Sequence, residues 1–347
     1  MHISGRLLAA KCENSWAVVL NIRRKSESID TTSTFRLILT NPNGIHPSVT
    51  YPDFMFSLHL CNEIRAGAIC LAETNLNWHH SQHHAALRRC LQKNWPASKY
   101  QISAPDETFL GNYQPGGTAT LIVDRWTSRV IGSGMDPHGL GRWSFVMLRG
   151  KQDINICIIS AYRVCDDKYT GSKTAYQQQK RQLSAMFRKQ KRITTPNPNR
   201  QFVLDLQSWI STLQKQGTQI ILRLDNNEEL KPSSGQVIKT TSDPPTPTIN
   251  SHHNGTLDTL IRSTGLIDVL SHQHPASHYP ATYNRGKKRI DLILVSISLL
   301  PAVARSGILP YHSLFQGDHR PCYVDLDATI AFEGKTPSIC PPCQRSL

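Results

Sequence analysis

Short apolar runs recur along the chain, separated by longer segments in which apolar residues return every three or four positions. Seven runs are rich in β-branched residues and bounded by turn residues, and they predict strands at 67–73, 117–123, 144–150, 154–162, 219–225, 289–296 and 321–327. A further strand begins at Phe35, in FRLILT. Segments with a helical period predict helices at 173–192, 201–216 and 256–264, the last two followed by glycines typical of helix ends. Together these elements predict an α/β domain.

Composition sets this domain between two flanking segments. Residues 1–34 form a polar, Ser/Thr-rich leader that we expect to be poorly ordered, 35–328 form the single folded domain, and 329–347 form a Pro- and Cys-containing tail or linker. Two internal segments, 194–200 and 240–255, are loops by composition, and the second is long enough to be either functional or disordered. No internal repeat and no dividing linker is visible, so one large domain is the simplest interpretation.

The net charge favours a polyanionic partner. Lys and Arg number 39 against 25 Asp and Glu, which gives a formal net charge of +14. Nucleic acid is the first candidate partner and an anionic membrane surface the second, with an ordinary soluble basic protein as the alternative. Apolar content of 39 % and charged content of 18 % are typical of a soluble globular protein rather than a disordered one.

Cysteine usage and hydropathy favour an intracellular protein. The nine cysteines are irregularly spaced, and several lie inside apolar runs, where a free thiol behaves as a small hydrophobe. Their odd number indicates a reducing compartment. The N-terminus lacks the apolar core of a signal peptide, and no stretch reaches the roughly 18 apolar residues of a membrane span. We therefore expect a soluble, intracellular chain with no membrane span, and we infer no obligate protein partner.

Polar side chains cluster where predicted strands end. The segments are TNPNGI with Asn41 and Asn43, ICLAET with Glu73, SAYR with Tyr162, LDNNE with Asp225 and Asn227, RIDLILVS with Asp291, and GDHRP with Asp318 and His319. Each segment alone has an ordinary interpretation as a turn, a core ion pair or a loop. Open strand ends build the ligand crevice of an α/β sheet, so all six together predict one acidic pocket with a single histidine.

Several carboxylates in one pocket repel one another unless a cation joins them. Carboxylate and amide oxygens select Mg²⁺, or Mn²⁺, over zinc. With a histidine, an aspartate to orient it and a phenol, the set is typical of metal-assisted phosphoester hydrolysis.

The same six segments resemble the endonuclease/exonuclease/phosphatase superfamily, which includes DNase I, exonuclease III and the apurinic/apyrimidinic endonucleases. The resemblance runs from about Phe35 to Asp327. It implies a DNase I-like four-layer α/β sandwich, with two packed mixed β-sheets flanked by helices. The segments GLGRWSFVMLRGK and ISAYRVC resemble more closely the endonuclease domains of LINE-type (non-LTR) retrotransposons. That implies a nucleus-located DNA-nicking enzyme that leaves a 3′-hydroxyl and a 5′-phosphate, and a reverse transcriptase domain in a longer polyprotein.

The resemblance also implies a role for each residue. Glu73 would be the principal metal ligand, and the metal site would be completed or supported by Asn41, Asn43 and Asp318. Asp225, helped by Asn227, would position or activate the attacking water. His319 would contact the scissile phosphate and be oriented by Asp291, and Tyr162 would hydrogen-bond a phosphate oxygen.

Three positions depart from the family pattern. Leu224 stands where the family usually has Gly before the aspartate of its Asp-x-Asn motif, and Gly317 stands where Ser commonly precedes Asp-His. Cys165 replaces the Asn that touches the phosphate in apurinic endonucleases. None of these removes a metal ligand or the histidine, but they weaken a prediction of abasic-site specificity.

Other clusters carry weaker predictions. The turn before the Asp291 strand bears Arg285, Lys287, Lys288 and Arg289, which we expect along a DNA backbone, whereas the basic run at 187–192 is by default a solvated helix end. His80 and His84 have the i, i+4 spacing of a zinc pair, but no third ligand accompanies them, so a helix face near the substrate is the better interpretation. CPPC at 340–343 is a lone Cys-x-x-Cys, typical of a linker or the start of another module.

The sequence thus predicts a Mg²⁺-dependent phosphodiesterase that nicks DNA. A phosphatase acting on lipid or small phosphoesters is one alternative, because the fold supports it as well. A catalytically decayed domain that only binds nucleic acid is the other.

Overall fold

Two six-stranded β-sheets form the centre of the protein in a computed structural model that describes residues 33–46, 51–107, 111–165, 173–228, 256–274, 279–284 and 289–333. In order across the first sheet lie β11 (Val303–Ile308), β12 (Cys322–Asp327), β1 (Thr34–Thr40), β2 (Ala66–Ala72), β4 (Thr118–Val123) and β3 (Ser98–Ser103). In order across the second lie β5 (Val130–Met135), β6 (Trp143–Arg149), β7 (Asn155–Tyr162), β8 (Gln219–Asp225), β10 (Asp291–Ser296) and β9 (Leu266–Asp268).

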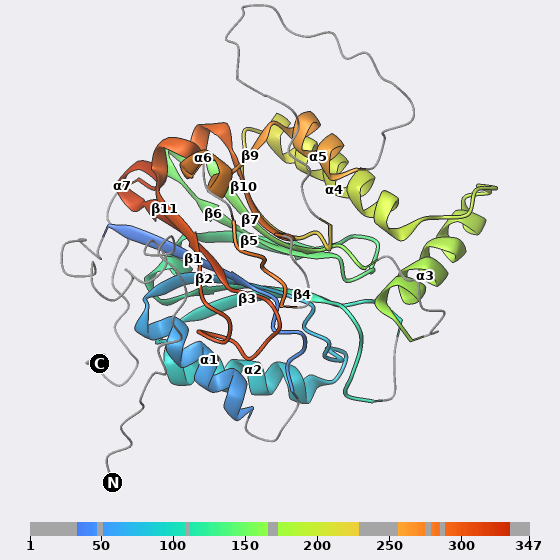
Figure 1. Cartoon of the computed structure of the whole chain (residues 1–347), viewed down its shortest axis with the longest axis horizontal. Coiled ribbons are helices and arrows are strands. Elements are labelled where there is room, and N and C mark those ends of the chain that lie inside the picture. The colour runs from blue at the N-terminus through green and yellow to red at the C-terminus, as the bar shows by residue number, and fades with distance from the viewer. Residues whose placement is uncertain are drawn as a thin grey trace, which may run out of the picture.

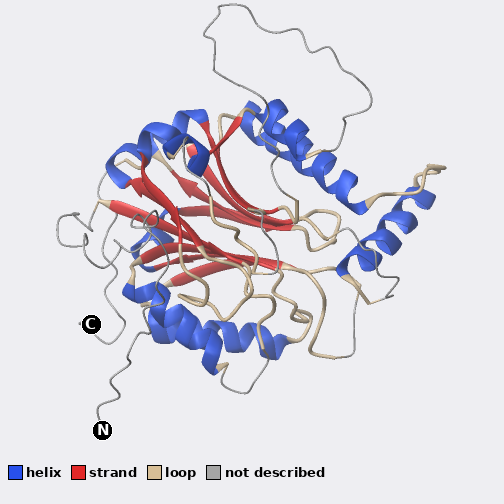
Figure 2. Ribbon diagram, in the orientation of Figure 1, coloured by secondary structure: helices blue, strands red, loops and turns tan. Residues whose placement is uncertain are grey.

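Helices cover the outer face of each sheet, which makes four layers (Figures 1 and 2). The first sheet is covered by α1 (Pro52–Glu63) and α2 (Ser81–Asn94), and the second by α4 (Pro198–Lys215) and α5 (Leu257–Thr264). The remaining elements are α3 (Ala175–Lys189), α6 (Val269–Gln273), α7 (Ala328–Ala331) and the 3₁₀ turns η2 (Asp124–Arg129), η3 (Lys151–Asp153) and η4 (Ile297–Ala302). The predicted four-layer α/β sandwich is confirmed.

Each sheet is mixed because it contains one parallel pair of strands among antiparallel neighbours. β1 runs parallel to β2, and β7 runs parallel to β8. Parallel neighbours need a crossover, which α1 supplies in the first sheet and α3 with α4 supplies in the second. The carboxyl ends of these four central strands therefore point to one end of the sandwich.

Side-chain alternation along the strands separates the inner core from the outer ones. On β8, Ile220, Leu222 and Leu224 pack toward α4, whereas Ile221 packs between the two sheets. With a period of two, Arg223 and Asp225 share the inner face with Ile221. Both sheet faces of this strand are buried, which explains why its sequence is a continuous apolar run rather than an alternating one.

Most predicted elements are present with small shifts at their ends. The strand predicted at 219–225 matches β8 residue for residue, and the helix predicted at 256–264 ends at Gly265 in the left-handed conformation, with φ of 61°. The loop predicted at 194–200 is partly wrong, since α4 begins at Pro198 after Asn197, whose side chain accepts a hydrogen bond from the Arg200 amide. Asn followed by Pro is a recognised helix start. Helix α1 was not predicted, and α2 was anticipated only as a helix face bearing His80 and His84.

The predicted domain limits need correction at both ends. β1 already starts at Thr34, and the folded unit continues past 328 because Ala331 and Phe332 are buried in the core between the sheets. Residues 1–32 and 334–347, including the Cys-x-x-Cys segment, lie outside the described residues. In the part of the chain that is described, no helix has the length and apolar character needed to cross a bilayer.

Candidate active site

The ends of β1, β2, β7 and β8 deliver Asn41, Glu73, Tyr162 and Asp225 to the same end of the sandwich. Two more residues arrive on strands that run the opposite way. Asp291 is the first residue of β10, and His319 lies just before β12. Antiparallel neighbours begin where parallel strands end, so these residues meet those of the central strands. The predicted convergence on one pocket is therefore seen for these six residues.

Asp225 and Asp291 face each other across the β8–β10 ladder, in which they are directly paired. Alternation places both on the inner face of the second sheet, because Ile221 on β8 and Ile293 on β10 belong to the core between the sheets. Asp225 has no exposed surface and Asp291 is 5 % exposed. Two buried carboxylates are thus neighbours at the floor of the site.

Asp291 is held by two cationic groups. Its Oδ2 lies 2.8 Å from His319 Nδ1, and its Oδ1 accepts a hydrogen bond of 3.0 Å from Arg223 Nη2. The Thr282 hydroxyl accepts the Asp291 backbone amide at 3.2 Å. The predicted orienting pair of His319 and Asp291 is present, with the imidazole N–H donating to the carboxylate.

The environments of the two aspartates push their pKa values apart. Burial, followed by the charge of Asp291, raises the pKa of Asp225 to about 6. Burial also acts to raise the pKa of Asp291, yet the charge and hydrogen bond of His319 and the charge of Arg223 hold it below its usual range. Burial acts to lower the pKa of His319, but the carboxylates of Asp291 and Asp225 raise it to about 9. At neutral pH the site therefore holds an imidazolium beside one firmly ionised and one easily protonated carboxylate.

Asn41 bridges the two sheets at this site. Its Nδ2 donates to Glu73 Oε2 at 2.9 Å and to Asp225 Oδ2 at 2.7 Å, and it lies 3.4 Å from His319 Nε2. Its Oδ1 accepts the backbone amide of Asn43 at 2.7 Å. Asn41 thus acts as a bridge in this geometry, and it would act as a metal ligand only after its amide turned. The side chain of Asn43 is exposed, and only its backbone contributes a contact described here.

Tyr162 lies beside Glu73 in the candidate active site. Burial, with the negative charge of Glu73 next in size, raises the pKa of Tyr162 well above its usual range. The phenol therefore stays protonated and can donate a hydrogen bond, as its expected role at a phosphate oxygen requires.

The carboxylate of Asp318 has an oxygen that could bind a divalent cation. Asp318 Oδ1 is buried and has no hydrogen-bond partner within the described residues, which is costly for a carboxylate unless a cation serves it. The closest acidic cluster among the described residues is Asp225, Asp291 and His319, whose ligand atoms lie within 4.8 Å of one another. His319 Nδ1 is engaged with Asp291 Oδ2, which leaves its Nε2 to face the pocket. The predicted ligands Glu73 and Asp318 offer carboxylate oxygens, and hard oxygen donors suit Mg²⁺ or Mn²⁺.

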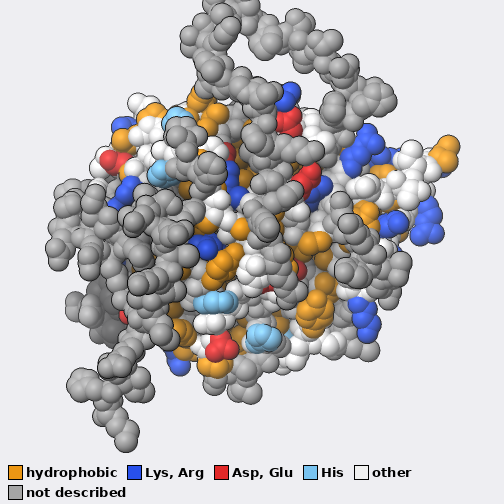
Figure 3. Space-filling model, viewed as in Figure 1, with side chains coloured by type: hydrophobic (Ala, Val, Ile, Leu, Met, Phe, Trp, Pro, Cys, Tyr) orange, Lys and Arg blue, Asp and Glu red, His pale blue; other side chains and the backbone are white. Residues whose placement is uncertain are grey.

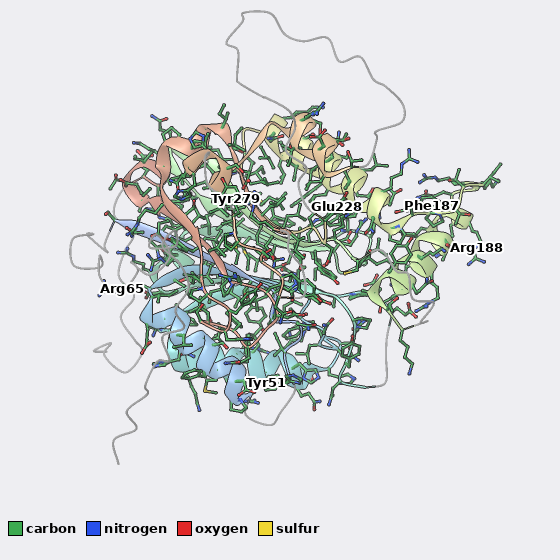
Figure 4. The ribbon with its side chains drawn as sticks, in the orientation of Figure 1. Tyr51, Arg65, Phe187, Arg188, Glu228 and Tyr279 are labelled. Carbon is green, nitrogen blue, oxygen red and sulfur yellow. The ribbon has the colours of Figure 1, made fainter. Side chains whose placement is uncertain are left out.

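Asn227 takes part in the turn that follows β8. It has a left-handed backbone, with φ of 52°, and its Nδ2 donates to the Arg163 carbonyl at 2.7 Å while its Oδ1 lies 2.9 Å from Cys165 Sγ. Its backbone amide donates to Asp225 Oδ1 at 3.3 Å. Asn227 therefore positions Asp225 through the turn. The next residue, Glu228, is exposed at the rim and is labelled in Figure 4.

The two departures at Leu224 and Gly317 have clear physical reasons. Leu224 points away from the site into the core beneath α4, so the turn after β8 needs no extra room. Gly317 packs against the backbone after β1, where an added Cβ would come within 2.7 Å of the Asn41 carbonyl oxygen. A serine at 317 would therefore displace the chain that carries Asn41.

The expected DNA-contacting turn is mostly outside the described residues, which exclude Arg285, Lys287 and Lys288. The expectation for Arg289 is wrong. Its side chain is 8 % exposed, pairs with the Asp268 carboxylate and lies over the Tyr279 ring, 4.6 Å from the centroid. These contacts hold the short β9–α6 segment against β10, so Arg289 is a structural residue.

His80 and His84 do not form part of a metal cluster of three or more ligands in the described segments. His84 Nε2 lies 2.9 Å from the Trp78 carbonyl, and His80 precedes the first residue of α2. Both histidines contact the segment that enters α2.

Arg223 is the main site residue that was not predicted. It is 1 % exposed, and besides Asp291 it contacts the Ala161 carbonyl at 3.2 Å. A lone arginine inside the apolar run QIILRLD was the available signal, because a buried guanidinium needs an anionic partner.

Comparisons with known proteins agree with this architecture. No protein-family model and no curated protein matches the sequence. Solved structures do match: the AP endonuclease LMAP from Leishmania major has a TM-score of 0.55 at 15 % identity, covering 86 % of this chain and 89 % of that one. The catalytic domain of APE2 from Xenopus laevis has a TM-score of 0.53 at 16 % identity, covering 84 % and 92 %. At such identities the likeness shows the fold alone, and the expected DNase I-like fold is confirmed.

Proposed function

We propose that this protein is a divalent-metal-dependent phosphodiesterase that nicks DNA. The observation that carries the proposal is the pairing of Asp225 with Asp291 in register, with His319 beside both. The opposed pKa shifts of the two aspartates assign them different tasks, one to take a proton and one to hold the histidine. If Asp291 and His319 formed an ion pair with a purely structural role, they would not require Asp225, a second carboxylate with a raised pKa, beside them.

Asp225 serves as the general base. A carboxylate whose pKa is raised to about 6 is still mostly ionised at pH 7, yet it accepts a proton more readily than an ordinary aspartate. The attacking water gives its proton to Asp225 while its oxygen forms the new bond to phosphorus. The bond from phosphorus to the leaving 3′ oxygen breaks, and that oxygen takes a proton from solvent water, so the products are a 3′-hydroxyl and a 5′-phosphate.

His319 and Tyr162 serve the phosphate. The imidazolium keeps Nδ1 on Asp291 and turns Nε2 toward the pocket, where it can donate to a non-bridging phosphate oxygen. Tyr162, protonated at all ordinary pH values, supplies a second donor. Glu73 and Asp318 would hold the Mg²⁺ ion, which supplies charge neutralisation at the phosphate when bound.

The finer proposal concerns the biological setting. We infer from the retrotransposon-like segments GLGRWSFVMLRGK and ISAYRVC that the nick primes reverse transcription, with a reverse transcriptase as partner and the nucleus as the place of action. The net charge of +14 supports a polyanionic substrate. Cys165, which contacts Asn227, supports ordinary DNA over abasic sites as the substrate.

The test is a comparison of substrates in Mg²⁺ and in EDTA. Supercoiled plasmid, an abasic duplex and p-nitrophenyl phosphate are offered to the full chain, and the product ends are tested for direct extension by a DNA polymerase. We expect Mg²⁺-dependent nicks with extendable 3′-hydroxyl ends. Hydrolysis of p-nitrophenyl phosphate without plasmid nicking would establish the phosphatase alternative, and DNA binding without any hydrolysis would establish a decayed nuclease.

A further inference from the structure

Helix α3 projects beyond the edge of the sandwich, unlike the helices that lie flat on the sheets (Figure 1). Its first residues, Ala175 and Tyr176, pack against Tyr162 and Val164, so the helix begins directly beside the candidate active site. A helix of 15 residues rises about 21 Å between its first and last residue. The far end of α3 therefore lies about 20 Å from the first turn of the helix, which contacts Tyr162.

All charged residues of the segment 173–192, which contains α3, are cationic. From 173 to 192 the sequence contains no Asp or Glu, and its cations are Lys173, Lys180, Arg181, Arg188, Lys189, Lys191 and Arg192. Arg181 pairs with Glu107 at 2.8 Å. The last four, which we call the α3 basic end, are all exposed and form no ion pair within the described residues. Lys and Arg side chains are visible at this end of the molecule in Figure 3, and Arg188 is labelled in Figure 4.

Stabilisation of the helix dipole explains only part of this cluster. Arg188 and Lys189 lie in the last turn, where cations are favourable. Lys191 and Arg192 follow the helix, and Lys191 takes a left-handed backbone with φ of 56°. Four exposed cations within five residues repel one another, so this cluster does not stabilise the unbound protein. The Arg192 guanidinium is nevertheless held in place, 3.5 Å from the centroid of the Phe187 ring.

We propose that the α3 basic end binds the phosphate backbone of duplex DNA outside the cleaved position, as a second contact site of the enzyme. This inference rests on the proposed function. Duplex DNA rises about 3.4 Å per base pair, so about 20 Å corresponds to a reach of up to about six base pairs from the cut. Phosphate contacts of this kind fix the register of a protein on the duplex without reading its bases.

The apolar residues of the segment argue against a membrane surface as the partner. An interfacial helix presents an apolar face to the lipid. The apolar side chains Leu183 and Phe187 of α3 are instead buried against Leu140. Within 173–200, Ile193 is the one large apolar side chain that is exposed. Charge without an exposed apolar face fits a nucleic-acid backbone.

The experiment compares two variants of equal charge change in the full chain. The first carries Arg188→Gln, Lys189→Gln, Lys191→Gln and Arg192→Gln. The matched control carries Arg88→Gln, Arg89→Gln, Lys93→Gln and Lys99→Gln, four exposed cations in the second half of α2 and at the start of β3, toward the opposite end of the strands. Binding to a fluorescein-labelled duplex of about 30 base pairs is measured by anisotropy in Ca²⁺ at several salt concentrations.

We expect the first variant to raise the Kd about 10- to 100-fold and to reduce the slope of log K against log salt by about 2 to 4. Its Mg²⁺-dependent hydrolysis of bis(p-nitrophenyl) phosphate, which is too small to reach the helix end, should equal that of wild type. Unchanged duplex affinity and slope would overturn the proposal, as would an equal loss in the control. The proposal would also be overturned if the first variant lost binding to phosphatidylserine vesicles but retained its affinity for the duplex. That result would identify a membrane surface as the partner of the α3 basic end. If wild type hydrolyses no diester, the proposed function fails, while the binding result still decides the role of α3.

Discussion

Asp225 and Asp291 are paired residue to residue across β8 and β10, and only Asp291 of the two contacts both Arg223 and His319. This asymmetry is built from strand register and from one arginine in an apolar strand. It gives two adjacent carboxylates of the same type opposite pKa shifts.

Asp291→Asn should lower kcat/KM for plasmid nicking by at least about 100-fold, because an amide stabilises the imidazolium far less than a carboxylate. Arg223→Met should lower it about 10- to 100-fold, since Asp291 then loses one of two orienting partners. Arg36→Met is the matched control, because Arg36 also pairs with a buried aspartate, Asp325, but near the start of β1 and away from the site. Equal loss of activity per folded molecule in Arg36→Met would contradict the assignment.

Asp225→Asn should stabilise the metal-free protein at neutral pH. The folded pKa of about 6 lies above the ordinary value of 3.8, so ionised Asp225 weakens the fold at pH above 6 and not at pH below 4. The difference of about two pKa units corresponds to roughly 2–3 kcal/mol. Urea unfolding in EDTA should show the variant more stable at pH 7.5, with the gap closing as pH falls from about 6 to 4. A gap independent of pH would show that Asp225 carries no raised pKa.

Gly317→Ser should lower nicking activity about tenfold or more while leaving the protein folded. The added Cβ meets the Asn41 carbonyl at 2.7 Å, and Asn41 joins Glu73 to Asp225, so the two halves of the site should separate slightly. Gly132→Ser, at a position with nothing within 4 Å of the new Cβ, is the control and should retain full activity. Crystal structures of both variants would measure the Asn41 shift directly.

Leu224→Gly, which restores the residue common in the resembling family, should destabilise the protein by about 3–5 kcal/mol. Leu224 is fully buried under α4, and deleting such a side chain costs the transfer energy of its carbons and leaves a cavity. Leu224→Ile, which conserves volume, should cost less than about 1.5 kcal/mol. Urea unfolding measures both, and a neutral glycine substitution would show that the turn after β8 gains from the change.

The sequence predicted that the candidate site residues converge, and it predicted the helices on the second sheet, but it largely missed those on the first sheet. Asp225, Asp291 and His319 were recognisable because strands rich in Ile, Val and Leu end abruptly in polar residues, and this contrast is local. Helix α1 was missed because the exposed Phe56 interrupts the pattern of its buried residues. Helix α2 was anticipated only as a helix face at His80 and His84, although its buried Ala86, Leu87, Cys90 and Leu91 do follow a helical period.

Local sequence patterns could not predict which residues pair between strands that are distant in the sequence. That Arg223 would meet Asp291 depends on the register of β8 against β10, which no local window contains. Arg289 was misjudged for the same reason, since its partner Asp268 lies on the short strand β9 that was not predicted. A basic run beside a site looks the same in sequence whether it faces DNA or an internal carboxylate.

The central claim, that Asp225 and His319 cut DNA with the help of a divalent metal, is tested most directly by supercoiled-plasmid nicking. Wild type, Asp225→Asn and His319→Gln are compared in Mg²⁺ and in EDTA, with Asp258→Asn, a half-buried carboxylate on α5, as the control. We predict Mg²⁺-dependent nicking by wild type and the control, and rates at least about 1,000-fold lower for the two site variants. Absence of Mg²⁺-dependent nicking by wild type, or undiminished nicking by Asp225→Asn, would contradict the claim.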